Sequence, residues 1–436
     1  MLDFRGAQKN GSMLNTTDPN LLMTHLISPA NEALNHCEHG RSCPGLSDSQ
    51  WLQMGVERSI KECKTGRGFL QEWAMSHCED AIGVSHFFET LKSQRRLNLI
   101  TEVNTRVSAS MPSHPHSQID ELEDLAKVDI YAGDGHYHKT STHEWPIKGK
   151  RRAVGHFYTQ NLRTHSLTHL TGADHEAGRK KGEHDMHALK RMTTAQLRQG
   201  ASKGKQVLYV WDCAGIDIPQ WHRWKQSAGI YFLSRAKDLF KFTFYGEIDF
   251  DREDRVNRGV IADQLVTNAT SQVTFRYIKY QCPDTGIEYE FITNHMKIRP
   301  GVLAWLYKRR WDIEKTYDTF KNKMNECKAW ARSTNAKTMQ AQFICLAHNL
   351  MVLIDSNLSS NLKINNHKEI QRCRKRGDQA EQSSKLQGRE FSPLYLNPLK
   401  RSQLTLKFIR WLRHHLVMES TMRHATVSLR QVYAMF

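Results

Sequence analysis

The chain has 436 residues and carries 62 lysines and arginines against 45 aspartates and glutamates, a formal net charge of +17. This surplus favours a polyanionic partner, most simply nucleic acid, over a merely basic soluble protein. Hydrophobic residues make up 39% of the chain, which is enough for a real core. No apolar run approaches the roughly 20 residues needed to cross a membrane. Nine scattered cysteines and no signal-peptide pattern indicate a reducing cytosol rather than a disulfide framework.

The N-terminal part is a polar segment followed by helices. Residues 1–46 are expected to be poorly ordered, because most of them are polar and rich in Asn, Thr and Ser. Residues 47–115 are expected to form a small helical domain, since Ser47 can cap a helix and apolar residues recur at helical spacing from Val84 onward. A zinc site is an alternative for one cluster here, although its spacings match no standard finger. The cluster comprises His36, Cys37, His39, Cys43, Cys63, His77 and Cys78.

Residues 120–355 are expected to form an α/β unit. Three short runs predict an antiparallel meander, at Val128–Ala132, Ala153–Tyr158 and Leu167–Leu170. The apolar run Val207–Trp211 is typical of a central strand covered on both faces, and it ends at Asp212. The stretch Gly172–Arg191 is charged and rich in His and Gly, which predicts a loop or a solvated helix. Strand-forming residues then dominate from about 230 to 290, more than a compact connection needs, so we expect an inserted β-domain there.

The stretch Arg299–Met324 predicts one long helix with a polar stripe. At roughly 100° per residue, Tyr307, Arg310, Glu314 and Lys321 fall within about 60° of one another. The flanking apolar and aromatic residues are expected to face the core: Leu303, Leu306, Trp311, Ile313 and Phe320. An amphipathic helix with ordinary i,i+3 and i,i+4 ion pairs is the alternative interpretation.

The C-terminal part, residues 356–436, is expected to be a linker followed by a helical region. Met339–Leu353 before it is an apolar helix, whereas Ser356–Arg389 is polar and charged, which predicts a loose linker or a frayed helix. Leu404–Met418 predicts a basic amphipathic helix, which could contact DNA, a partner subunit or the core.

The spacing Tyr307-x2-Arg310-x3-Glu314-x6-Lys321 resembles the YREK signature of insertion-sequence family 4, a large group of DDE transposases. The context is similar as well. Arg310 to Glu314 resembles the RWxIE core of that family, and Phe291–Asn294 resembles the apolar strand ending in TN that precedes its helix.

Phosphoryl transfer with two divalent ions needs carboxylates that converge from distant parts of the chain. Asp134, Asp212 and Glu314 meet this need, and the resemblance implies that they are the catalytic and metal-binding residues. Each also has a structural alternative: a hairpin turn for the first, a turn cap for the second and an exposed ion pair for the third. Asp129 and Asp217 are the fallback acids.

The resemblance implies an α/β fold, with an RNase H-like catalytic core of five strands, a β-strand-rich insertion at about 230–290, and helical N- and C-terminal additions. It implies a metal-dependent endonuclease and polynucleotidyl transferase that carries out cut-and-paste DNA transposition, a form of DNA recombination, of an insertion sequence. Two Mg2+ or Mn2+ ions would be the cofactors. The partner would be double-stranded DNA, as terminal inverted repeats and as target, bound by a homodimer in a synaptic complex. We expect this mobile-element protein in the cytoplasm, at the nucleoid of a bacterial-type cell, with no membrane partner.

The resemblance also assigns roles outside the acids. Tyr307, Arg310 and Lys321 would bind phosphates of the transposon end. We expect Arg310 and Lys321 to do so rather than pair with Glu314, from which Lys321 is about 10 Å away along the helix axis. Residues 47–115 would bind the DNA end, or else serve as a dimerisation or packing unit.

Two other functions fit the same acids or the same charge. One is a stand-alone RNase H-like nuclease, and the other is a catalytically inactive or domesticated DNA-binding relic.

Overall fold

The computed structural model describes most of the chain. The described residues are 21–43, 45–62, 65–77, 82–114, 117–146, 149, 151–174, 183–237, 240–268, 272–283, 285–324, 326, 328–388 and 406–435. The helices are α1 Leu22–Leu34, α2 Asp48–Ile60, α3 Gly66–Ser76, α4 Val84–Thr90, α5 Gln94–Ser110, α6 Asp185–Lys190, α7 Thr194–Leu197, α8 Ile218–Ala228, α9 Pro300–Arg309, α10 Trp311–Lys323, α11 Thr334–Ser360, α12 His367–Leu386, α13 Leu406–Val417 and α14 Met422–Met435. The strands are β1 Val128–His138, β2 Val154–Asn161, β3 Leu167–Gly172, β4 Gln206–Val210, β5 Ile230–Arg235, β6 Phe242–Glu247, β7 Val260–Asn268, β8 Phe275–Gln281 and β9 Glu288–Thr293.

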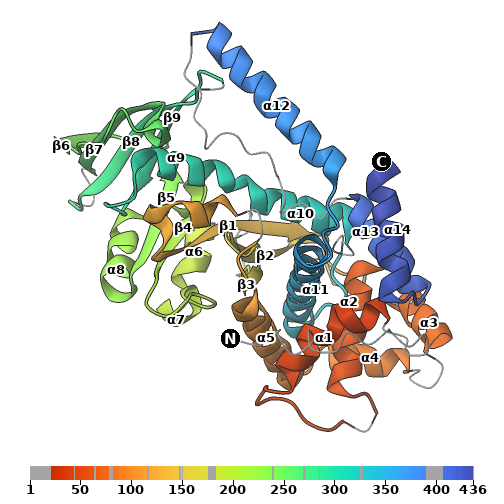
Figure 1. The fold of residues 1–436 in the computed structure, drawn as a ribbon. Helices are drawn as coiled ribbons and strands as arrows, with labels where there is room; N and C mark the ends of the chain where they lie inside the picture. Colours follow the sequence, from red (N-terminus) through yellow and green to blue (C-terminus); the bar gives the residue numbers. More distant parts are fainter. Residues whose placement is uncertain are drawn as a thin grey trace.

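One mixed sheet organises the fold, with strand order β3-β2-β1-β4-β5-β9-β8-β7-β6 (Figure 1). The first five strands form the expected RNase H-like core. Strands β1, β2 and β3 are an antiparallel meander, and β4 and β5 run parallel to β1. Strand β4 is covered on both faces, as its unbroken apolar run predicted.

The strand-rich insertion is not a separate sheet. Strand β5, which the sequence analysis placed in the insertion, pairs parallel with β4 and belongs to the core. The inserted strands β6–β9 continue the same sheet, because β9 pairs antiparallel with β5 at Leu233 and Thr293. This pairing satisfies backbone groups that the edge of β5 would otherwise leave open.

The two faces of the sheet carry different apolar clusters. One cluster lies against α6, α7 and α8, with Tyr209 and Trp221 among its members. The other joins the opposite face to α10, α11 and the N- and C-terminal helices, with Trp51, Phe343 and Phe408 among its members. The N-terminal helices therefore share one hydrophobic core with this face of the sheet.

The expectation of poor order is wrong for the described part of the N-terminal segment, and the structure decides between the two alternatives for the segment after Ser356. Helix α1 lies within residues 1–46, and its apolar face is buried, with Leu22 and Leu26 fully inaccessible; residues 1–20 lie outside the described residues. For the stretch after Ser356 a loose linker or a frayed helix was expected, and the structure shows helix, namely the end of α11 followed by the 20-residue helix α12. The N-cap at Ser47 is confirmed, as a capping box with Gln50.

The expected long helix after Arg299 is divided at Arg310 into α9 and α10. The backbone N–H groups of Arg310 and Ile313 each bond three residues back rather than four, to Tyr307 and Arg310, which tightens the chain there. Arg310 keeps helical dihedral angles (φ −52°, ψ −33°), so the two helices follow one another across the molecule (Figure 1).

The basic helix near the C-terminus is α13, and its apolar face packs into the core through Phe408, Trp411, Leu412 and Leu416. Its Trp411 indole donates to the carbonyl of Ala425 in α14 at 2.7 Å. Within the described residues, no helix has both the length and the apolar composition of a membrane span.

Candidate active site

Two of the three predicted acids belong to adjacent parallel strands, Asp134 within β1 and Asp212 two residues beyond the end of β4, on the same face of the sheet. Ala132 of β1 and Val210 of β4 are paired across the sheet. Side chains alternate along an extended chain, so Asp134 and Asp212, each two residues further on, project to that same face. Asp134 lies within β1 and pairs with β2, which rules out the hairpin-turn alternative.

Asp212 also caps the turn that follows its strand. Its Oδ1 accepts a hydrogen bond from the backbone N–H of Ala214 at 2.8 Å. This contact uses one carboxylate oxygen and fixes the side chain at the C-terminal end of β4. The capping alternative is therefore correct, and it is compatible with a second role, because a carboxylate has further acceptor positions.

Arg310 connects the third acid to the first. Its Nη2 donates to Oε1 of Glu314 at 2.7 Å, and its Nη1 lies 3.5 Å from Oδ2 of Asp134. The Arg310 side chain is 8% exposed, whereas those of Asp134 and Glu314 are 21% and 31% exposed. The expectation that Arg310 does not pair with Glu314 is thus wrong for this structure. Burial alone would lower the pKa of Arg310, but Tyr307, Glu314 and Asp134 outweigh it and raise that pKa.

Burial also determines the protonation of Asp134. Removal from water raises its pKa to about 7, and the nearby Asp212 and Asp185 carboxylates act in the same direction. Arg310 and the backbone N–H of Gly135, which donates to Oδ1 at 2.8 Å, act against it. Asp134 therefore lies close to other acids and can exchange a proton near neutral pH.

The other members of the polar stripe differ in their surroundings. Tyr307 is half-buried against Phe291 of β9, with ring centroids 5.1 Å apart, and the Arg310 guanidinium lies 5.8 Å from its ring centre. Lys321 is exposed two helical turns beyond Glu314. Trp311, which was expected in the core, is 55% exposed and lies 5.8 Å from the Arg310 guanidinium.

A tyrosine that the sequence analysis missed holds α10 against β1. The hydroxyl of Tyr317 donates to the backbone carbonyl of Asp134 at 2.7 Å. Tyr317 lies three residues after Glu314 and so on the same side of the helix. The Tyr317 hydrogen bond thereby helps to position Glu314 relative to Asp134. In the sequence, the signal for this role was the three-residue spacing between Glu314 and Tyr317.

A buried cluster beneath α10 adds to this attachment. Glu326, which is fully buried, has Oε2 3.0 Å from Nε2 of His136, and it accepts a hydrogen bond from the Tyr158 hydroxyl at 3.0 Å. His136 is two residues after Asp134 on β1. The chain after α10 is therefore tied to both β1 and β2, and no sequence motif indicated this.

A fourth carboxylate near the acids was also missed. Asp185 begins α6 and accepts a hydrogen bond from the indole N–H of Trp211 at 2.8 Å. Burial raises its pKa, and Asp212 contributes in the same direction, so the two carboxylates are close. Its segment had been predicted only as a loop or solvated helix, because Asp185 becomes significant only once α6 lies beside the end of β4.

The fallback acids have structural roles instead. Asp129 is buried at the start of β1, where it accepts from the backbone N–H of Ser202 at 2.6 Å. Asp217 caps α8, accepting from the backbone N–H of Gln220 at 2.9 Å, and it pairs with Lys190.

The N-terminal cysteine and histidine residues have separate partners. The Cys37 thiol contacts the carbonyl of Ala33 at 3.3 Å, His39 lies 3.1 Å from Glu102, and the Arg95 guanidinium lies 3.5 Å from Cys43. Cys63 and Cys78 lie outside the described residues.

The chemistry of the acid site suits a hard divalent cation only in part. Carboxylate oxygens are the preferred ligands of Mg2+. Yet in the described part of the chain no three His, Cys, Asp or Glu side chains are placed to hold a metal together. Between Asp134 and Glu314 the positive charge is supplied by Arg310. Metal binding by Asp134 and Glu314 through the oxygens that face Arg310 would require Arg310 to release these two carboxylates.

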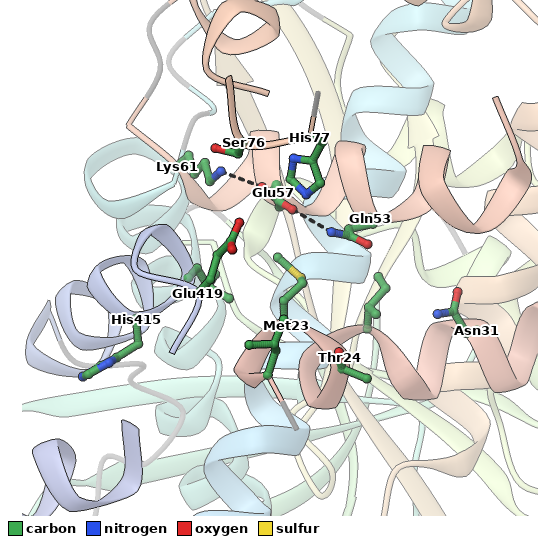
Figure 2. A pocket seen from close by; sticks show the side chains of 13 residues that line it. Met23, Thr24, Asn31, Gln53, Glu57, Lys61, Ser76, His77, His415 and Glu419 are labelled. Carbon is green, nitrogen blue, oxygen red and sulfur yellow. Dashed lines mark hydrogen bonds and ion pairs between the residues drawn. The ribbon is translucent and has the colours of Figure 1, made fainter. Parts of the chain in front are cut away.

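A separate cavity of about 280 Å³ lies among α1, α2, α3 and α13 (Figure 2). Within its lining, Glu57 has Oε2 2.6 Å from Nζ of Lys61 and accepts from Gln53 at 3.0 Å. The cavity contains none of the predicted site residues.

One family model matches part of the chain. Residues 148–350 match the family model described as Transposase DDE domain. The matched stretch includes Asp212, Glu314 and the whole polar stripe, and it begins 14 residues after Asp134 (148 − 134). No curated protein matches the chain.

Proposed function

We propose that this protein is a DDE transposase of insertion-sequence family 4, which cuts DNA at the ends of a mobile element and joins the freed ends to a target. The observation that carries this proposal is the placement of Asp134 and Asp212 on one face of the sheet, with Glu314 linked to Asp134 through Arg310. The match of residues 148–350 to the transposase DDE domain supports the reaction class.

The three acids would hold two divalent ions, Mg2+ or Mn2+, once Arg310 turns from Glu314 and Asp134 to a DNA phosphate. Bound ions would supply Lewis-acid activation of the phosphate and of the attacking oxygen. Arg310 suits the exchange, because a guanidinium can bind two oxygens of either a carboxylate or a phosphate. Tyr307 and Lys321 would contact neighbouring phosphates.

The remaining assignments follow from this function. The partner is double-stranded DNA, first as the terminal inverted repeats and then as the target. The helices between residues 47 and 115 would bind the transposon end, and the chain would act as a homodimer in a synaptic complex. The net charge of +17 supports a polyanionic partner.

The decisive experiment uses the genomic DNA that flanks the gene. A plasmid that carries this flanking DNA is incubated with the protein, Mg2+ and a second plasmid as target. We expect excision between short inverted repeats and covalent joining to the target. Nicks without joined products would indicate a stand-alone nuclease, and binding without metal-dependent cleavage would indicate an inactive relic.

A further inference from the structure

A wide groove opens beside α10, at the C-terminal end of β1. Five cationic residues line it, from three separate segments: Lys139 after β1, Arg151 and Arg152 before β2, and Lys321 and Lys328 at the end of α10 and just beyond. Its volume of about 1040 Å³ lies at the upper limit of ordinary small-molecule pockets, roughly 300–1000 Å³. Size and charge together suit a segment of a polyanion better than a metabolite.

The positive charge of this basic groove is not neutralised by its own lining. Among the described lining residues the only carboxylate is Glu326, which is fully buried and turned towards His136. The side chains of Lys139, Arg151 and Lys321 make no hydrogen bond or ion pair with any other described residue. Three cations are thus available to an external anion.

The basic groove adjoins the acid site. Lys321 is seven residues after Glu314 on α10, about 10 Å along the axis at 1.5 Å per residue. Lys139 is five residues after Asp134 along β1, about 16 Å away at roughly 3.3 Å per residue. Within one DNA strand the rise is about 3.4 Å per nucleotide, so Lys321 is some three nucleotides from the acids.

We propose that the basic groove binds the phosphodiester backbone of the DNA strand that leads away from the bond held at Asp134, Asp212 and Glu314. This inference rests on the proposed function and adds the route that the DNA strand takes away from the acid site. Point cations contact phosphates without reading bases. Binding in the groove is therefore independent of sequence, and it positions the scissile bond by holding the strand beyond it.

The test compares two charge-matched double variants. Lys139→Glu with Arg151→Glu changes the groove, whereas Lys127→Glu with Lys203→Glu changes exposed lysines just before β1 and β4, at the N-terminal end of these parallel strands. The probes are a labelled single-stranded 20-mer and the corresponding duplex, both of arbitrary sequence, in EDTA. Binding is measured against salt concentration, and thermal melting verifies that each variant is folded.

The groove variant should bind at least about tenfold more weakly, with a slope of log affinity against log salt that is shallower by about 1–2 units. The control should keep most of its affinity and slope. A loss confined to the single strand would identify an unpaired strand as the occupant, and an equal loss on the duplex would identify duplex DNA. Equal DNA affinity and salt dependence of the two variants would contradict DNA binding in the groove while leaving the proposed function intact. If the unaltered protein binds neither probe, both proposals fail.

A second measurement avoids any folding defect of the variants. Acetylation of the unaltered protein, with and without the 20-mer, is read by mass spectrometry. DNA should protect Lys139 and Lys321 but not Lys127 and Lys203. Equal modification of Lys139 and Lys321 in the two states would contradict the proposal.

Discussion

The Arg310 guanidinium donates to the carboxylate of Glu314, with 2.7 Å between Nη2 and Oε1, one helical turn further along the chain. An exposed pair of this kind stabilises a helix by only about 0.3–0.5 kcal/mol. Here Arg310 is almost fully buried and also lies 3.5 Å from Asp134, so each charge depends on the others for compensation. The site therefore has its own internal cation, whose place a metal ion bound by both carboxylates would take.

The first prediction concerns this replacement. Arg310→Ala leaves two carboxylates without their cation, so the metal-free variant should lose about 1–3 kcal/mol of unfolding free energy at pH 8. Mg2+ should restore most of this loss, because the ion takes the place of the guanidinium. Urea unfolding with and without Mg2+ measures both effects. Arg309→Ala is the control. This substitution breaks a 2.7 Å ion pair with the buried Asp312, so the variant should be destabilised, and Mg2+ should not restore its stability. Equal rescue of both variants would show that Mg2+ acts elsewhere.

The second prediction is that Glu314→Gln abolishes cleavage and leaves DNA affinity nearly unchanged. The amide keeps the size of the side chain but loses the charge that a divalent ion requires. Metal-dependent nicking and binding in EDTA are measured on the same DNA. Asp318→Asn, which removes a 56% exposed carboxylate one turn later, should still cleave. Persistent nicking by Glu314→Gln would remove Glu314 from the metal site.

The third prediction follows from the pKa of Asp134. Burial raises it to about 7, whereas an unfolded aspartate ionises near 3.9. Between these values the folded protein binds more protons than the unfolded chain, so unfolding free energy falls as pH rises. Asp134→Asn removes this pH-dependent loss of stability. At pH 8 the unfolding free energy of the metal-free variant should therefore exceed that of the unaltered protein by about 1–2 kcal/mol.

Urea unfolding in EDTA at several pH values tests this third prediction. The advantage of Asp134→Asn should diminish towards pH 4, because the folded protein keeps Asp134 protonated there and about half of the unfolded chains carry the same proton. Asp318→Asn provides the comparison and should not alter the pH profile in this way. A constant difference from pH 5 to pH 8 would mean that Asp134 does not titrate near neutrality.

The fourth prediction concerns Gly133, which precedes Asp134 on β1 and faces Trp211. A Cβ atom there would lie 1.9 Å from Cζ3 of Trp211, on the face of the sheet opposite the acids. Gly133→Ala should cost roughly 1–3 kcal/mol and reduce cleavage, because β1 must shift beside Asp134. Gly246→Ala in β6, where no atom lies within 4 Å of the added Cβ, is the control. Thermal melting and cleavage are compared, and an unchanged Gly133→Ala variant would contradict the packing argument.

The fifth prediction is a steep salt dependence of DNA binding by the unaltered protein. Lysines and arginines that contact phosphates release counterions, so log affinity should fall linearly with log salt at about 0.9 per phosphate contacted on duplex DNA. Fluorescence anisotropy between low and physiological salt measures the slope. A flat response would remove nucleic acid as the partner.

Local signals in the sequence predicted much of this protein. The Ser47 cap, the central strand before Asp212 and the polar stripe around Glu314 were recognisable, because capping, burial on both faces and helical periodicity are short-range properties. The mixed α/β sheet with helical ends was likewise expected, and it is observed.

Only the tertiary structure decided how these parts meet. It divided the long helix at Arg310, joined β9 to the edge of β5, and placed Asp185 beside Asp212. The sequence determined which carboxylates were candidates, since the strand and helix patterns fix the face on which each one lies. The protonation of Asp134 and the pairing of Arg310 with Glu314 depend instead on burial and on charges brought from distant parts of the chain, which no local pattern encodes.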